Sequence, residues 1–138
     1  MKNTLKIFTI LFFVVNYSCK GQQMVQVPND VHKIKTNEEL FINKPLRNLL
    51  KEIKPEIKTA GANNGFPSYF SFSFKDYKQL KTGKYVDKKK VNLYVYVKEQ
   101  IDWKWENRPK GQELVWTKED AEKYGNLTVI RIKVIGKE

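Results

Sequence analysis

Three segments of the chain alternate apolar and polar residues with the two-residue period of a β-strand. The positions predicted to face inward are Phe70, Phe72 and Phe74 in the first segment, Val91, Leu93, Val95 and Val97 in the second, and Thr128, Ile130, Ile132 and Val134 in the third. Such alternation is typical of an antiparallel sheet that is covered on one face only. We therefore expect an α+β fold, in which an antiparallel sheet of about four strands carries one or two helices on one face.

The first helix is predicted after Asn43, where apolar residues recur at the spacing of one helical face. These residues are Leu46, Leu49, Leu50, Ile53 and Ile57. Pro45 suits the first turn of a helix, so the helix is expected to begin at Asn43 or Lys44. Pro55 should end or kink it at Lys54, because proline removes a backbone hydrogen bond and clashes with the preceding turn.

A second helix is predicted over residues 118–124. Thr117 is a suitable N-cap, Asp120 follows three residues later, and Gly125 closes the segment. The stretch from Ala60 to Gly65 contains glycine and asparagine and is predicted to be a loop. Residues 36–138 are then expected to form a single domain.

The stretch between Ile101 and Trp116 contains a turn signal at residues 107–111. It predicts a hairpin of residues 102–106 and 112–116, in which Trp103 and Trp105 share a face. Paired tryptophans can stack on sugar rings or fill a partner's pocket. The alternative, which we prefer for tryptophan, is that both rings close one end of the core.

The outward positions of the predicted sheet form a candidate binding surface of aromatic and cationic side chains. They are Tyr69, Tyr94, Tyr96, Arg131 and Lys133. Such a surface suits an anionic glycan, a lipid headgroup or an acidic protein, whereas an export signal and the lack of an RNP motif argue against nucleic acid. An ordinary solvated sheet face is the competing interpretation.

Basic residues dominate the composition, with a formal net charge of +11. Seven lysines lie between Lys75 and Lys90, against only Asp76 and Asp87. This segment is interpreted as a solvated connection whose lysines discourage edge-to-edge pairing of strands. Contact with an anionic membrane surface is the functional alternative.

The N-terminus has the order of a secretory signal peptide. Lys2 and Lys6 precede an apolar run from Ile7 to Val15, and Ser18 stands before the single cysteine, Cys19. The run is too short for a membrane-spanning helix. Residues 1–18 are therefore predicted to be a signal peptide, and residues 19–35 a tether in which the only histidine, His32, is solvated.

The residues Asn16-Tyr17-Ser18-Cys19 resemble the lipobox of bacterial lipoproteins. That family usually has an apolar residue in place of Asn16 and a small one in place of Tyr17. The resemblance implies that Cys19 is lipidated and that its acyl chains anchor the protein to a membrane on the periplasmic or outer-membrane side of a bacterial envelope. Ordinary signal cleavage near Gly21, without lipid, is the alternative.

Residues that carry chemistry are scarce. The chain has no glycine-rich phosphate loop and no histidine pair, so neither a cofactor nor a metal is expected, and we predict no enzyme. A non-catalytic binding or accessory module of the cell envelope is the preferred function, with an envelope protein or an anionic glycan as partner. The alternatives are an immunity-type inhibitor of a toxin that reaches the periplasm, and a glycan-active enzyme that uses Glu99, Asp102 and Glu106.

Overall fold

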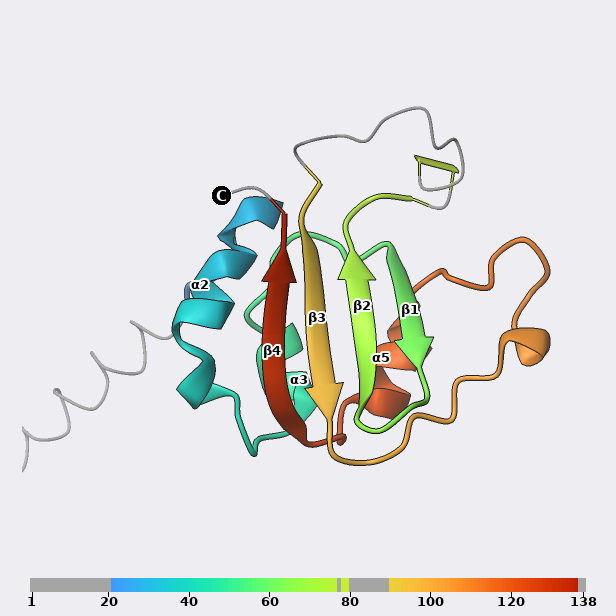
Figure 1. The fold of residues 1–138 in the computed structure, drawn as a ribbon. Helices are drawn as coiled ribbons and strands as arrows, with labels where there is room; N and C mark the ends of the chain where they lie inside the picture. The colour runs from blue at the N-terminus through green and yellow to red at the C-terminus, as the bar shows by residue number, and fades with distance from the viewer. Residues whose placement is uncertain (1–20, 77, 80–89, 137–138) are drawn as a thin grey trace, which may run out of the picture.

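The alternating segments lie side by side in one antiparallel sheet (Figure 1). The computed structural model describes residues 21–76, 78–79 and 90–136. The strands are β1 (Thr59–Asn63), β2 (Ser68–Ser73), β3 (Asn92–Val97) and β4 (Val129–Ile135), and they are adjacent in that order. The prediction of an α+β fold with an antiparallel sheet is confirmed.

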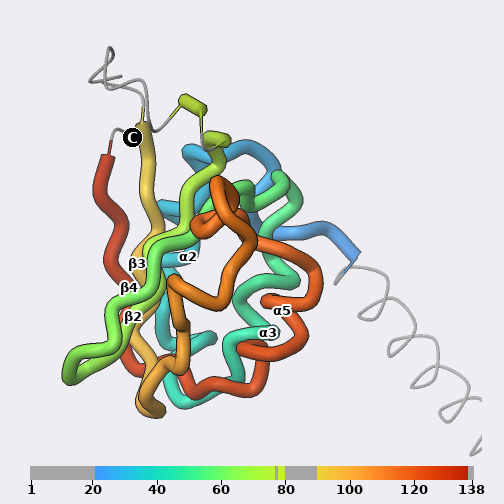
Figure 2. The backbone as a smooth tube through the Cα atoms, turned by 90° about the vertical axis from the view of Figure 1, so that its right-hand side faces the viewer, coloured from blue at the N-terminus to red at the C-terminus, as the bar shows by residue number. Residues whose placement is uncertain are grey.

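The helices of the described chain are short. They are α2 (Val31–Thr36), α3 (Leu46–Leu50) and α5 (Lys118–Tyr124), with 3₁₀ turns η1 (Pro28–Asp30), η2 (Glu38–Leu40) and η3 (Trp105–Asn107). Figure 2 shows α3 and α5 together on one side of the sheet, while α2 runs beside the outer strand β4 (Figure 1). Across the residues with described positions, no helix is both long enough and apolar enough to cross a membrane.

The core lies between the sheet and these helices. Alternate side chains of β2 and β3 are fully buried, namely Phe70, Phe72, Leu93, Val95 and Val97. Rings from the long β3–β4 connection close over Phe70 in edge-on contacts, with centroid distances of 6.0 Å to Trp103, 5.5 Å to Trp116 and 5.1 Å to Tyr124. Burial of these rings gives the connection a fixed place on the sheet.

A β-bulge in β4 changes which of its residues face the core. Val97 pairs with Val129, and Tyr96 pairs with Arg131, so Ile130 is the extra residue. The prediction that Ile130 faces inward is therefore wrong: its side chain is 37% exposed, whereas Val129 is fully buried. Beyond the bulge Ile132 faces the core, as its place in the alternation predicts.

The predicted loop at Ala60–Gly65 is also corrected, because its first four residues belong to strand β1. The small residues at positions 60–62 carry no alternation signal, yet they pair with residues 70–72 of β2. The outer edge of β1 is covered in turn: the Ala60 amide donates to the Leu114 carbonyl at 2.8 Å, and the Trp116 amide donates to the Lys58 carbonyl at 3.0 Å. This pairing uses edge groups that would otherwise be open to another chain.

Helix α3 is shorter than the predicted one. It spans only Leu46–Leu50, and Pro45 is its N-cap rather than a residue of its first turn. The stripe itself is core, since Leu46 and Leu49 are fully buried, while Leu50 is only half-buried. Packing against the sheet rather than helix length therefore holds this segment.

Helix α5 has the predicted N-terminus. Thr117 and Asp120 form a capping box, in which each side chain accepts a hydrogen bond from the other residue's amide. Gly125 does end the helix, but its φ of −62° is an ordinary right-handed one. A Cβ atom at this position would come within 2.7 Å of the Ala121 carbonyl oxygen, so the backbone here favours glycine.

The segment predicted to be a tether, residues 19–35, is folded where the structure describes it. Val25, Val31 and Ile34 are fully buried, and Val25 forms a β-bridge with Ile53. His32 lies in α2 and is half-buried, which differs from the expected solvated position. The apolar residues here give no sustained period, yet these three side chains belong to the hydrophobic core.

Two predictions fall on residues outside the described ranges. They are the signal peptide with the lipidated Cys19, and most of the basic segment from Lys75 to Lys90.

Candidate functional site

The predicted outward residues come together on the uncovered face of the sheet. We call Tyr69, Tyr94, Tyr96, Arg131 and Lys133 the tyrosine–cation face. The strand register aligns them in two neighbouring rows across the strands: Asn63, Tyr69, Tyr96 and Arg131 form one row, and Gly61, Ser71, Tyr94 and Lys133 form the next. The prediction that these five side chains share one face agrees with this register.

The three tyrosine rings form a cluster in which Tyr69 contacts both of the others. The ring centroid of Tyr69 is 4.9 Å from that of Tyr96 and 5.9 Å from that of Tyr94. All three side chains remain partly exposed, so one side of the aromatic cluster faces solvent. This arrangement gives a broad apolar surface with hydroxyl groups at its margin.

Positive charge borders the rings on the β4 side. The guanidinium carbon of Arg131 is 5.2 Å from the Tyr96 ring centroid, and Lys133 stands opposite Tyr94. Arg131 and Lys133 are exposed, and no residue in the two rows is acidic. The rings can stack on a partner, and the cations beside them can pair with anions. This combination suits a ligand or a protein surface that carries negative charge.

The turn between β1 and β2 adds a residue that the sequence analysis did not identify. Figure 2 shows this turn projecting from the sheet toward its uncovered side. Phe66, in the turn, is 92% exposed. Asn63 connects the turn to the face, because its amide nitrogen lies 3.4 Å from the Tyr69 hydroxyl and its side-chain oxygen accepts from the Gly65 amide at 2.8 Å. Phe66 therefore extends the aromatic surface beyond the sheet.

The tryptophan pair behaves differently from the prediction. Residues 102–106 and 112–116 form no hairpin, and Trp105 lies in η3. Trp103 is only 7% exposed and packs in the core, whereas Trp105 is 50% exposed, so the two rings share no face. The expectation of a joint Trp103–Trp105 surface is wrong. The preferred alternative, that both rings close the core, holds for Trp103 and is wrong for Trp105.

Arg108 explains how this connection holds its shape. Its guanidinium carbon lies 3.7 Å from the Trp103 ring centroid. It donates two hydrogen bonds to the Asp120 carboxylate, at 3.1 and 2.8 Å, and further ones to the Glu113 and Val115 carbonyls, both at 2.6 Å. The turn signal predicted only that Arg108 belongs to a turn. Its hydrogen-bond partners could not be predicted, because only the folded chain brings them next to Arg108.

The same contacts determine the ionisation of Asp120. Burial alone would raise the pKa of its carboxyl group, but hydrogen bonds from Arg108 and Thr117 outweigh burial and lower the pKa below its ordinary value. The two charged side chains are 14% and 10% exposed. This is a mostly buried ion pair with a structural role.

Two of the three acids considered for glycan chemistry have other partners, and the third, Glu106, is exposed in η3. Glu99 accepts hydrogen bonds from the amide and hydroxyl of Thr128, both at 2.7 Å, and Asp102 pairs with Lys123 at 3.3 Å. Slight burial raises the pKa of Glu99, yet the Thr128 hydrogen bonds lower it overall. A general acid needs the opposite shift.

No protein family, curated protein or solved structure matches this chain. Among the residues whose positions are described, no three His, Cys, Asp or Glu side chains gather as a metal ion would require.

Proposed function

We propose that this protein is a lipid-anchored binding module of the cell envelope, and that the tyrosine–cation face recognises its partner. The anchor is Cys19, for which the lipobox-like residues 16–19 are the support. The partner is an acidic envelope protein or an anionic glycan, since either one offers negative charge to Arg131 and Lys133.

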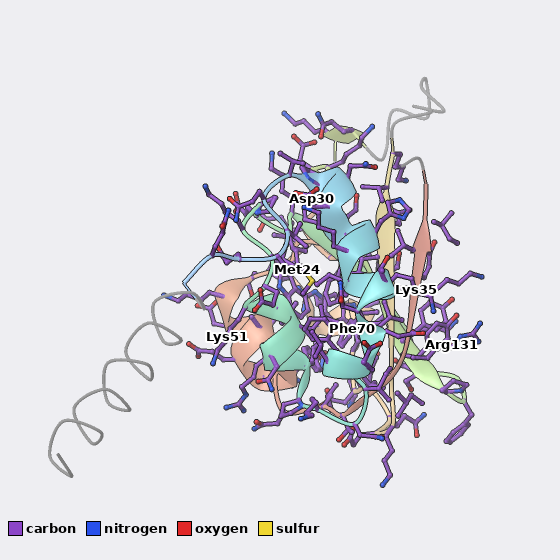
Figure 3. All side chains as sticks on the ribbon, turned by 90° about the vertical axis from the view of Figure 1, so that its left-hand side faces the viewer. Met24, Asp30, Lys35, Lys51, Phe70 and Arg131 are labelled. Carbon is purple, nitrogen blue, oxygen red and sulfur yellow. The ribbon has the colours of Figure 1, made fainter. Side chains whose placement is uncertain are left out.

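The observation that carries this proposal is the position of the face relative to the start of the folded chain. Figure 3 shows Lys51 and Arg131 on opposite sides of the molecule, with Phe70 between them. Gln23 is hydrogen-bonded to the Lys51 carbonyl, so the chain enters on the Lys51 side. An anchor attached just before Gln23 leaves the tyrosine–cation face directed away from the membrane.

The composition of the face supports recognition rather than solvation alone. Three contacting tyrosines are not needed to fill the core, which lies on the other side of the sheet. Tyrosine is enriched where proteins bind partners, because its ring gives contact area at a low cost in conformational entropy.

Photo-crosslinking in the native cell tests this proposal. A benzophenone amino acid replaces Tyr96 on the face in one variant and Asn48, an exposed residue of α3, in the matched control. We expect the variant at position 96 to give a discrete adduct that protease or a glycosidase degrades, and the control to give none of that size. An adduct with a secreted toxin would instead support the immunity-type function. A partner adduct formed from position 48 alone would contradict the proposal.

A further inference from the structure

A groove runs between α3 and α5, on the side of the molecule away from the tyrosine–cation face. Its volume is about 470 Å³, and its floor includes Leu50 and Ala121. Arg47, Lys51 and Lys118 line it, and all three are exposed. We call this the basic groove.

A second hollow of about 330 Å³ continues the basic groove. It shares Leu50, Lys118 and Ala121 with the first and adds Lys54 and Glu56. The acids in the two hollows are Glu56 and Glu122, against the cations Arg47, Lys51, Lys54 and Lys118. The combined surface is apolar at its floor and carries an excess of positive charge.

The start of the folded chain is fixed beside this groove. The Gln23 side chain donates to the Lys51 carbonyl at 2.9 Å. The Val25 amide donates to the Glu52 carbonyl at 2.8 Å, and the Lys54 amide donates to the Val25 carbonyl at 2.9 Å. The backbone at Gln23 therefore cannot move away from the groove without breaking this short ladder.

We infer that the basic groove docks on the anionic phospholipid headgroups of the membrane that holds the anchor. This inference rests on the proposed function, because lipidation of Cys19 supplies the attachment. Gln23 is four residue steps beyond Cys19, a distance that a fully extended chain spans in roughly 14 Å. That reach keeps Gln23, and the Lys51 carbonyl to which its side chain is hydrogen-bonded, near the membrane surface.

Charge and proximity together favour the bilayer over an acidic peptide. Each basic residue near an anionic membrane surface strengthens binding by roughly fivefold, and the apolar floor accepts the upper part of an acyl chain. A peptide would meet the same charges, but the anchor gives the bilayer a much higher effective concentration at the groove. Docking would fix the domain with the tyrosine–cation face directed outward.

Amine labelling in vesicles tests the inference. The mature protein, purified from the cells that make it, is mixed with vesicles of phosphatidylcholine alone, or of an equal mixture of phosphatidylcholine and phosphatidylglycerol. A membrane-impermeant acylating reagent then labels lysines, which mass spectrometry quantifies. We expect labelling of Lys51, Lys54 and Lys118 to fall at least about threefold in the anionic vesicles, and to recover at about 1 M salt, where charges are screened within ~3 Å.

A charge variant and its matched control sharpen the result. Arg47→Gln with Lys51→Gln and Lys118→Gln should restore the labelling of Lys54 in anionic vesicles to its level in neutral ones. These side chains are exposed, so circular dichroism should show the same fold.

The control makes the same change of charge away from the groove, as Lys98→Gln with Lys104→Gln and Lys110→Gln, and should leave Lys54 protected. Equal labelling of the groove lysines in both kinds of vesicle would overturn the docking, as would protection that appears only after envelope proteins are added. Failure to float with neutral vesicles is a separate outcome. It would overturn the lipid anchor, and labelling in the anionic vesicles would still decide the docking.

Discussion

The two faces of the same sheet differ in what their side chains do. On the covered face, Phe70 and Phe72 are fully buried against rings from the β3–β4 connection. On the other face, the rings of Tyr69 and Tyr96 touch each other and Arg131 stacks on Tyr96, yet both tyrosines stay partly exposed. Neighbouring residues of one strand therefore serve the stability of the fold on one side and present a surface on the other. Substitutions on the two faces should separate these roles.

The largest effect is expected from Phe70→Ala. Removal of a fully buried ring that contacts Trp103, Trp116 and Tyr124 leaves a cavity and should lower the free energy of unfolding by about 3–5 kcal/mol. Urea denaturation followed by tryptophan fluorescence measures this. A midpoint equal to that of the unchanged protein would mean that the covered face is not the core.

Arg108→Ala comes next and tests the connection above the covered face. It leaves the Asp120 carboxylate mostly buried without its cation, which should cost roughly 3 kcal/mol. Lys104→Ala, an exposed change in the same connection, is the control and should alter stability little. If both variants melted at the same temperature, the ion pair would have no structural role.

Acid should weaken the same contact. The folded-state pKa of Asp120 lies below its ordinary value of 3.8, so the carboxylate's stabilising contribution is complete above that value and is lost as the pH falls through the lowered folded-state pKa. Melting temperature measured from pH 6 downward should therefore drop on the acid side. Asp120→Asn should lower the melting temperature near neutral pH and make its fall at acid pH less steep. The remaining fall would come from Glu99 and Asp30, whose pKa values are also lowered. An unchanged slope in Asp120→Asn would contradict this assignment.

The alternation of apolar and polar residues predicted both faces of the sheet. It can be recognised in the sequence because burial of one face requires every second residue of a strand to be apolar. It also placed Arg131 and Lys133 with the tyrosines. What it missed depends on partners distant in sequence: the bulge at Ile130 is defined only by pairing with Tyr96 and Val97, and β1 is recognised only by its register with β2. The contacts of Arg108 are of the same kind.

The remaining features were not predicted because they involve small residues or loops, which carry no periodic pattern. The segment at residues 60–62 has side chains too small to show a face, and the exposure of Phe66 follows from the projection of its turn. The Trp103–Trp105 prediction failed because η3 rotates the chain, so two residues that would share a face of a strand point apart.

The smallest effect on stability is expected on the uncovered face. Tyr96→Ser removes ring contacts with Tyr69 and the stacking of Arg131, worth about 0.5–1.5 kcal/mol. Phe66→Ser should change the melting temperature even less, since that ring is almost fully exposed. Both should nevertheless reduce formation of the partner complex. Destabilisation of Tyr96→Ser as severe as that of Phe70→Ala would show that the two faces do not differ in role.

Tyrosine nitration in intact envelopes tests the central claim most directly. Tyr94 and Tyr96 should react several-fold more slowly in the envelope than in the purified lipoprotein, because the partner covers the tyrosine–cation face. Tyr124, which is buried in the core, should react slowly in both. Equal reaction of Tyr94 and Tyr96 in the two preparations would contradict the claim that this face is where the protein binds.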